Sequence, residues 1–305
     1  MTDLNDIIQQ LAPIKIIENA PLAQYTFTKT GGPVDYLIFP KNADEIKKAL
    51  DFANLNHIPW QVLGNASNLI VRDGGIRGFV FMLTDLVEMT HDGNNIYAQA
   101  GARLSKVTQF AGEKSLTGFE FACGIPGSVG GAIYMNAGAY GGEIANVLAT
   151  VDVITPNGEF KTYTAAEIHF AYRHSDLQET GDIIIGGTFA LQPGDQKEIF
   201  AKMKELTVLR ELKQPLEYPS CGSVFKRPEG FFTGRLIQQA GLQGKIIGGA
   251  QVSEKHAGFI VNLGTATATD YLNLIALIQK TVFEKSGINL VTEVRILGEE
   301  KNANQ

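Results

Sequence analysis

The sequence predicts a mixed α/β fold, in which helices and strands alternate along most of the chain. Three observations support this prediction. Residues 36–63 read as strand, helix and strand, Pro156-Asn157-Gly158 marks a tight hairpin, and helices alternate with strands again after residue 213. The first pattern requires a partly parallel sheet and the second an antiparallel or mixed one. A chain of 305 residues is long enough for two or three structural units.

The first predicted part, residues 1–87, contains the strand-helix-strand unit. An amphipathic helix is expected at 4–11, and a second helix follows Asn42, which forms an N-terminal capping pair with Glu45. The apolar residues of this second helix recur at helical spacing: Ile46, Ala49, Leu50 and Ala53. Strands are expected at 36–39, 60–63 and 69–71, with a further strand at 79–83 on the edge of the sheet.

The second and third parts, residues 88–212 and 213–305, meet at the proline-marked junction Lys213-Gln214-Pro215. In the second part we expect strands at 97–100, 151–154, 160–163 and 182–185 and helices at 104–114 and 196–212. In the third we expect helices at 234–240 and 270–284 and strands at 246–247, 258–261 and 293–297. The last strand is free to return toward the first part.

Residues 122–142 hold seven glycines in 21 positions and hardly a charge. The run is too apolar for a solvated linker and too rich in glycine for an ordinary strand or helix. Its backbone should therefore pack against something large and flat. Residues 127–131 lack the spacing of a dinucleotide turn, a phosphate loop or a nucleophile elbow. Composition alone leaves both cofactor binding and close packing open.

A second loop, Gly64-Asn65-Ala66-Ser67-Asn68, directly follows the strand predicted at 60–63. Amide groups that converge in such a turn suit an anionic pyrophosphate, although the same composition is also that of a plain turn.

Composition limits the classes of partner and compartment. The chain has 26 Lys and Arg against 32 Asp and Glu, a net charge of −6, so nucleic acid is not an expected partner. The N-terminus lacks a signal-peptide pattern and no apolar run could span a bilayer, so we expect a cytoplasmic protein without membrane insertion. The only two cysteines, Cys123 and Cys221, fit a reducing compartment. No metal site is expected, because C-x-x-C and H-E-x-x-H are absent.

Together the two loops resemble the UDP-N-acetylenolpyruvoylglucosamine reductase family, the flavin-dependent reductases of bacterial peptidoglycan synthesis. The matching segments are residues 63–69, 124–132 and 136–141, with further matches at 30–35, 171–175, 219–225 and 292–295, over nearly the whole chain. Ala66 departs from the pattern, because the family usually has a second glycine there, and its methyl group puts pyrophosphate affinity in question. The compact third part resembles the shorter subtype of the family.

The resemblance implies a two-part FAD-binding domain of the vanillyl-alcohol-oxidase type and a C-terminal substrate-binding α/β domain. It implies a monomeric oxidoreductase in which FAD takes hydride from NADPH and reduces the enolpyruvyl ether of UDP-N-acetylglucosamine to UDP-N-acetylmuramate. The implied cofactor-binding residues are Gly64, Asn65, Ala66, Ser67, Asn68, Gly124, Ile125, Pro126, Gly127, Ser128, Gly130, Gly131, Asn136, Gly138 and Ala139.

The implied catalytic residues are Ser223 as proton donor, Arg173 beside the substrate carboxylate and Glu293 as a carboxylate that completes the site. Whether Glu293 donates a proton or only orients the intermediate stays open. Lys226 and Arg235 are the expected diphosphate-binding residues. Two alternatives remain: an FAD-dependent sugar or alcohol oxidase on the same fold, and a nucleotide-sugar binding protein without turnover.

Overall fold

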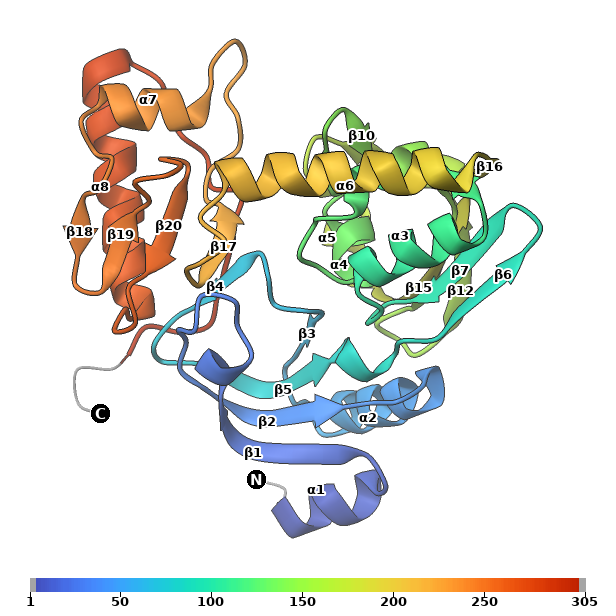
Figure 1. Ribbon diagram of the computed structural model, residues 1–305. Helices are drawn as coiled ribbons and strands as arrows, with labels where there is room; N and C mark the ends of the chain where they lie inside the picture. Colours follow the sequence, from blue (N-terminus) through green and yellow to red (C-terminus); the bar gives the residue numbers. More distant parts are fainter. Residues whose placement is uncertain (1–3, 302–305) are drawn as a thin grey trace. The chain divides into compact units, whose positions relative to one another are not determined.

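A computed structural model describes residues 4–301, which form two compact units (Figure 1). Among these residues, unit 1 comprises 4–18, 36–65 and 78–209, and unit 2 comprises 19–35, 66–77 and 210–301. Each unit is thus assembled from three separate stretches of the sequence. The division into three parts at residues 87 and 212 stays a prediction.

The first sheet has the strand order β1-β2-β5-β3, with β1 at Lys15–Pro21, β2 at Pro33–Phe39, β5 at Ile76–Met82 and β3 at Trp60–Leu63. Strands β3 and β5 are parallel, which confirms the prediction of a partly parallel sheet. The prediction that residues 79–83 form an edge strand is wrong, because β5 lies between β2 and β3. Residues 79–82 are all buried, and a continuous apolar run of this kind is typical of an interior strand covered on both faces.

Helix α2 (Ala43–Leu55) begins as its sequence predicted. The side chain of Asn42 accepts a hydrogen bond of 2.9 Å from the Glu45 N–H, which satisfies one of the free donors of the first turn. All four residues of its predicted apolar face are buried in the core of unit 1. Helix α1 (Leu4–Leu11) is also confirmed and adds Ile7 and Leu11 to the same core.

The second sheet of unit 1 is antiparallel throughout, in the order β12-β11-β15-β7-β6. Its strands are β6 (Met89–Asp92), β7 (Asn95–Gln99), β11 (Leu148–Ile154), β12 (Phe160–Thr164) and β15 (Ile183–Ala190). Strands β11 and β12 form the predicted hairpin, in which Ile154 pairs with Phe160. Gly158 adopts φ +82° in its turn, a conformation that favours glycine.

The glycine-rich run does contain a helix, which corrects the expectation that it forms none. Helix α4 (Val129–Tyr134) follows its N-cap residue Ser128 and packs against β15; its residues Val129, Ala132 and Ile133 are buried. Burial of these three side chains outweighs the low helix propensity of two glycines in the first turn. Downstream, the paired strands β9 (Gly138–Ala139) and β10 (Gly142–Glu143) make a short hairpin.

The remaining helices of the first 213 residues are α3 (Leu104–Glu113), α5 (Leu177–Thr180) and α6 (Gln196–Lys213). The remaining short strands are β8 (Leu116–Thr117), β13 (Phe170–Ala171), β14 (His174–Ser175) and β16 (Gln192–Pro193). Strands β13 and β14 form a tight hairpin with a two-residue loop.

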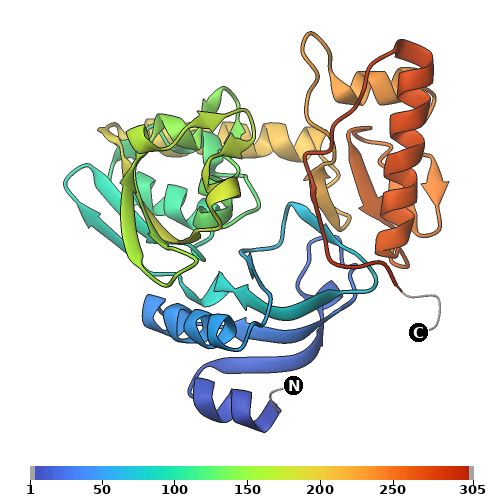
Figure 2. The same cartoon turned by 180° about the vertical axis from the view of Figure 1, so that it is seen from behind.

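Unit 2 is a sheet of order β17-β20-β19-β18 covered by two helices. Its strands are β17 (Ser220–Ser223), β18 (Ile246–Ile247), β19 (Ala250–Val252) and β20 (Phe259–Asn262), and its helices are α7 (Thr233–Gln239) and α8 (Ala268–Ser286). Figure 2 shows α8 along one face of this sheet, where it packs against β18, β19 and α7. The final strand, β21 (Arg295–Leu297), pairs in parallel with β4 (Leu69–Val71) from the first quarter of the chain.

Across residues 4–301, no helix is long and apolar enough to cross a membrane.

Candidate active site

In unit 1 the turn after β3 lies against the N-terminus of α4. Gly64 has no room for a side chain, because an added Cβ would collide with Ser128 Oγ and lie 3.9 Å from the Gly131 backbone nitrogen. Two predicted cofactor loops, about 60 residues apart in sequence, therefore meet at Gly64 and Ser128. This contact requires glycine at position 64, because any side chain there would occupy the space of the Ser128 hydroxyl.

Ser128 carries a polar group without a partner. Its side chain is 1% exposed, and its hydroxyl has no hydrogen bond even though Ser128 occupies the N-cap position of α4. A buried hydroxyl of this kind costs about 1–3 kcal/mol unless a partner satisfies it. Gln61 Oε1 on β3 is likewise buried and unpartnered. These groups fit a bound polar cofactor. Gln61 belongs to no motif that would have marked it in the sequence.

The loop between β3 and β4 continues into unit 2 with Ala66, Ser67 and Asn68. Ala66 adopts φ +47°, a left-handed conformation that costs a residue with a Cβ about 1–2 kcal/mol. This backbone explains why glycine suits the position. The Ala66 carbonyl accepts a hydrogen bond of 3.2 Å from the Phe27 N–H, which fixes the loop within unit 2.

Arg173 lies at the tip of the β13–β14 hairpin and meets the glycine-rich run. Its Nη2 donates a hydrogen bond of 3.0 Å to the Gly138 carbonyl, and its guanidinium lies 4.9 Å from the centre of the Tyr172 ring. The residue adopts φ +57°, so the hairpin holds its side chain at some conformational cost. Predicted catalytic and cofactor-binding residues are thus brought together in unit 1.

Three side chains hold this hairpin on α4 and the segment after it. Asn136 is fully buried; its amide donates to the Ala171 carbonyl at 3.1 Å and accepts from the Ala145 N–H at 3.0 Å. Ser175 Oγ and Gln178 Nε2 both donate to the Tyr134 carbonyl at 2.8 Å. The side chain of Asn136 therefore serves to position the loop. Gln178 was not among the predicted site residues, because it belongs to no recognisable sequence motif.

In unit 2 the fold places Ser223, Glu293 and Asn68 beside one another. The N–H of Glu293 donates to the Val224 carbonyl at 2.8 Å, next to Ser223 at the end of β17. Asn68 Nδ2 donates to the Glu293 carbonyl at 3.3 Å. Gly222 precedes Ser223 with φ +79° and turns the strand at this point.

Glu293 precedes the last strand, which begins at Arg295 and not at Glu293 as predicted. Ser223 and Glu293 are both half-exposed, whereas Val294 is buried. The carboxylate and the hydroxyl therefore remain accessible to a ligand. The three predicted catalytic residues are divided between the units, with Ser223 and Glu293 in unit 2 and Arg173 in unit 1.

Lys226 and Arg235 are linked through the start of α7. The Lys226 carbonyl accepts a hydrogen bond of 3.2 Å from Thr233 Oγ1, and its N–H donates to Val291 at 2.8 Å. Lys226 is half-buried and Arg235 is exposed on the first turn of α7.

Cys123 contacts helix α6, and Cys221 is buried in the core of unit 2. Cys123 Sγ donates to the Met203 carbonyl on α6 at 3.5 Å and lies 3.8 Å from Thr207 Oγ1. Complete burial raises the pKa of the Cys221 thiol to about 12, so it stays protonated.

Two family models match the chain. The FAD binding domain matches residues 34–164, and the UDP-N-acetylenolpyruvoylglucosamine reductase C-terminal domain matches residues 214–297. The first match agrees with the predicted vanillyl-alcohol-oxidase type of fold and with FAD as the cofactor.

Full-length relatives carry the reductase name. The UDP-N-acetylenolpyruvoylglucosamine reductase of Streptococcus uberis is 60% identical over 299 residues, which cover 98% of this chain and 99% of the relative. That of Lactobacillus delbrueckii subsp. bulgaricus is 61% identical over 283 residues, which cover 93% and 95%. The crystal structure of the reductase from Thermus caldophilus superimposes with a TM-score of 0.79 at 35% identity, covering 93% of this chain and 98% of that one.

The sequence identity extends over nearly the full length of this chain and of each relative, and the C-terminal domain model is named for these reductases. These two findings show the family. The chain belongs to the UDP-N-acetylenolpyruvoylglucosamine reductase family.

Proposed function

We propose that this chain reduces the enolpyruvyl ether of UDP-N-acetylglucosamine to UDP-N-acetylmuramate, with NADPH as reductant, in the cytoplasmic synthesis of peptidoglycan precursors. The observation that carries the proposal is that one unit holds both the contact of Gly64 with the unpartnered Ser128 hydroxyl and the Arg173–Gly138 hydrogen bond. We infer that the enzyme acts as a monomer. When bound, FAD supplies the hydride-transfer chemistry of this reaction.

The glycine cradle at Gly64 and the α4 N-terminus would hold the pyrophosphate, with the Ser128 hydroxyl as a donor. Gly124, Ile125, Pro126 and Gly127 form a compact turn that ends where the Gly127 carbonyl accepts from the Leu104 N–H. This bond fixes the turn to the start of α3. Asn65, Ser67 and Asn68 supply further polar groups, and Gly130, Gly131 and Ala139 let the backbone approach closely.

Arg173 binds the substrate carboxylate. Addition of hydride to the outer carbon of the double bond leaves an electron pair on the carbon next to that carboxylate, so negative charge grows there. A guanidinium is always charged and can pair bidentately with a carboxylate, which stabilises this enolate. The hydrogen bond to Gly138 and the Tyr172 ring hold the guanidinium in place beforehand.

Ser223 donates the proton that completes the reduction. The hydroxyl hydrogen passes to the carbon next to the carboxylate, a C–H bond forms, and the serine oxygen regains a proton from solvent. A serine is a weak acid, so this role depends on its position more than on its acidity. Glu293, held beside Ser223 through the Val224 carbonyl, is placed to donate to or orient the same intermediate.

A Glu293→Gln variant tests the second carboxylate. We expect turnover to fall by at least about 10-fold, because the amide keeps the shape but loses the charge and the acidic proton. The measurement is the rate at which the enolpyruvyl substrate reoxidises the NADPH-reduced enzyme. Glu284→Gln, on the exposed end of α8, is the matched control. Full turnover in Glu293→Gln would remove this residue from the chemistry.

The double variant Lys226→Ala/Arg235→Ala tests diphosphate binding. Loss of two cationic partners should raise KM for the UDP-sugar by about 10- to 100-fold and flatten its dependence on salt concentration, with little change in kcat. Steady-state kinetics over a series of NaCl concentrations measures both effects. Lys245→Ala, an exposed lysine of the same unit, should behave as wild type. An unchanged salt dependence in the double variant would count against the assignment.

Ser128→Ala separates cofactor binding from packing. Removing an unpartnered buried hydroxyl should stabilise the apoprotein by about 1 kcal/mol, while the loss of a hydrogen bond should weaken FAD by roughly 5- to 10-fold. Denaturant unfolding and flavin fluorescence titration give the two values. Ser105→Ala on the exposed face of α3 controls for the substitution itself. Greater stability with unchanged FAD affinity would show that the hydroxyl does not meet the cofactor.

The proposed reaction as a whole is tested by flavin absorbance under anaerobic conditions. NADPH should bleach the enzyme and the enolpyruvyl UDP-sugar should restore its colour. Reoxidation by oxygen with a sugar or alcohol as reductant would favour an oxidase, and flavin that remains attached after acid precipitation would favour a covalent flavoprotein. A colourless protein that binds the UDP-sugar without turnover would favour a binding protein.

A further inference from the structure

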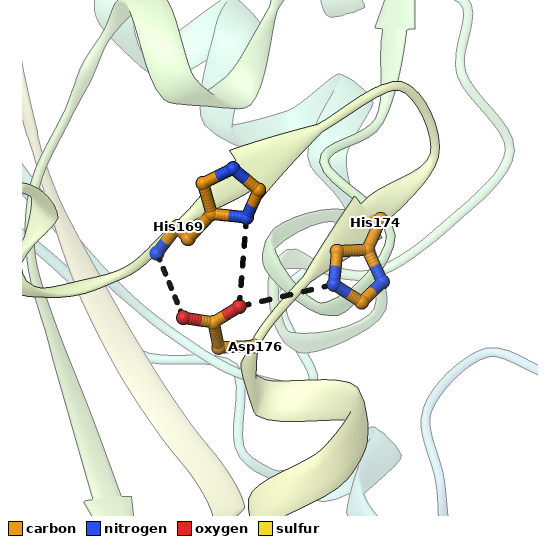
Figure 3. Close-up of side chains that lie close together, drawn as sticks. All are labelled: His169, His174 and Asp176. Carbon is orange, nitrogen blue, oxygen red and sulfur yellow. Dashed lines mark hydrogen bonds and ion pairs between the residues drawn. The ribbon is translucent and has the colours of Figure 1, made fainter.

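The outer side of the β13–β14 hairpin carries a cluster of two histidines and a carboxylate (Figure 3). His169 directly precedes β13, and His174 lies on β14 and is followed by Ser175 and Asp176. Pairing of the two strands brings these residues to one side of the hairpin. The proposed reduction assigns no role to these three residues.

The geometry is close to that of a coordination sphere. His169 Nδ1 lies 3.7 Å and His174 Nε2 lies 3.8 Å from Asp176 Oδ1, and the three potential ligand atoms all lie within 4.8 Å of one another. Four ligands at zinc distances in a tetrahedron stand roughly 3.3 Å apart, so small side-chain rotations would suffice to bind an ion. Figure 3 shows that the same oxygen of the Asp176 carboxylate faces a ring nitrogen of both histidines.

The carboxylate is oriented by the backbone. Asp176 Oδ2 accepts a hydrogen bond of 3.1 Å from the His169 N–H, and the Asp176 N–H donates to the His169 carbonyl at 3.2 Å. This reciprocal pair leaves Oδ1 directed at both imidazoles. Support of a ligand by a second hydrogen bond is the usual arrangement at metal centres. Glu179 Oε1, 3.6 Å from His174 Nε2, offers a fourth oxygen.

We propose that His169, His174 and Asp176 bind a divalent first-row transition-metal ion, with Zn²⁺ as the representative. Two imidazoles and carboxylate oxygen form a donor set suited to these ions and poorly suited to Mg²⁺ or Ca²⁺. The proposal differs from the expectation of no metal site. That expectation depended on the absence of C-x-x-C and H-E-x-x-H, whereas these three ligands are brought together by a hairpin. The His169 side chain is 74% exposed, so the site should bind reversibly rather than as a permanent structural centre.

The test is direct titration of the FAD-loaded enzyme, free of any polyhistidine tag and freed of metal with a chelator. We expect Zn²⁺ to bind with one equivalent per chain in competition with a chromophoric chelator. Co²⁺ should give ligand-field absorption beyond the flavin bands. The variants His174→Ala and His169→Ala should each weaken Zn²⁺ by at least about 10-fold, and Glu179→Gln by less.

His91→Ala is the matched control, because His91 is exposed on β6 of the same unit. It should bind Zn²⁺ as wild type does. The flavin content of each variant verifies folding, so a failure of the reductase assignment would not alter the result. Absence of saturable Zn²⁺ binding, or equal binding by wild type, His169→Ala and His174→Ala, would overturn the proposal.

Discussion

Replacing Ser223 by alanine should lower turnover by about 10²- to 10⁴-fold, the usual contribution of a positioned proton donor. Bleaching by NADPH should proceed at the wild-type rate, because that half-reaction needs no proton from this residue. Reoxidation by the enolpyruvyl substrate should become slow. Stopped-flow absorbance of the flavin follows the two half-reactions separately and identifies which one is affected.

The control for Ser223 lies three residues earlier on the same strand. Ser220 is half-exposed and pairs with Val261 on β20, so Ser220→Ala makes the same chemical change on β17. It should leave both half-reactions within about twofold of wild type, as surface substitutions usually do. Loss of NADPH bleaching in Ser223→Ala would mean that the substitution disturbs the flavin, and a wild-type second half-reaction would exclude Ser223 as the donor.

Replacing Arg173 by alanine should lower kcat/KM for the enolpyruvyl substrate by about 10²- to 10³-fold, the magnitude found when one stabilising donor of an oxyanion is removed. Arg173→Lys should recover only part of this loss, because an ammonium cannot make the bidentate contact. Guanidinium ion added to Arg173→Ala should restore some activity. These effects are measured by steady-state kinetics at fixed NADPH.

Tyr172→Leu separates the charge of Arg173 from its support. The ring contributes a cation–π contact worth about 0.5–1 kcal/mol, so its loss should cost only about two- to fivefold. If Arg173→Ala lost no more than Tyr172→Leu, and guanidinium gave no rescue, Arg173 would be a structural residue of the hairpin. A loss confined to NADPH oxidation would likewise contradict a role at the substrate carboxylate.

Individual helices and turns could be predicted from the sequence, because the residues that determine them are close together in the chain. The Asn42 cap, the apolar face of α2 and the turn around Gly158 all depend on residues within one or two turns of chain. The position of β5 depended instead on which strands share a sheet, and residue spacing does not encode that order. Helix α4 was missed because packing against β15 overrides the weak propensity of its glycines.

For the candidate site, the sequence indicated which residues belong to it but not how they contact one another. The resemblance supplied the family, which the comparisons confirm, and the list of candidate residues, which stays a prediction. It could not supply the contact of Gly64 with Ser128 or of Arg173 with Gly138, because these pairs are separated by 35 residues or more and meet only through the fold. Ser128 illustrates the difference: the resemblance named it as a cofactor-binding residue, but its unpartnered buried hydroxyl is a property of the folded chain.

The assembly of unit 2 from three distant stretches bears on how the protein is made. Asp73 caps the start of α8 by accepting from the N–H groups of Ala268 and Thr269, and Asn262 donates to the Thr28 carbonyl. Residues 28 and 73 are synthesised 195 residues or more before these partners. Unit 2 can therefore complete its fold only near the end of translation. Until then, the segments around residues 28 and 73 lack their partners and are accessible to chaperones as part of the nascent chain.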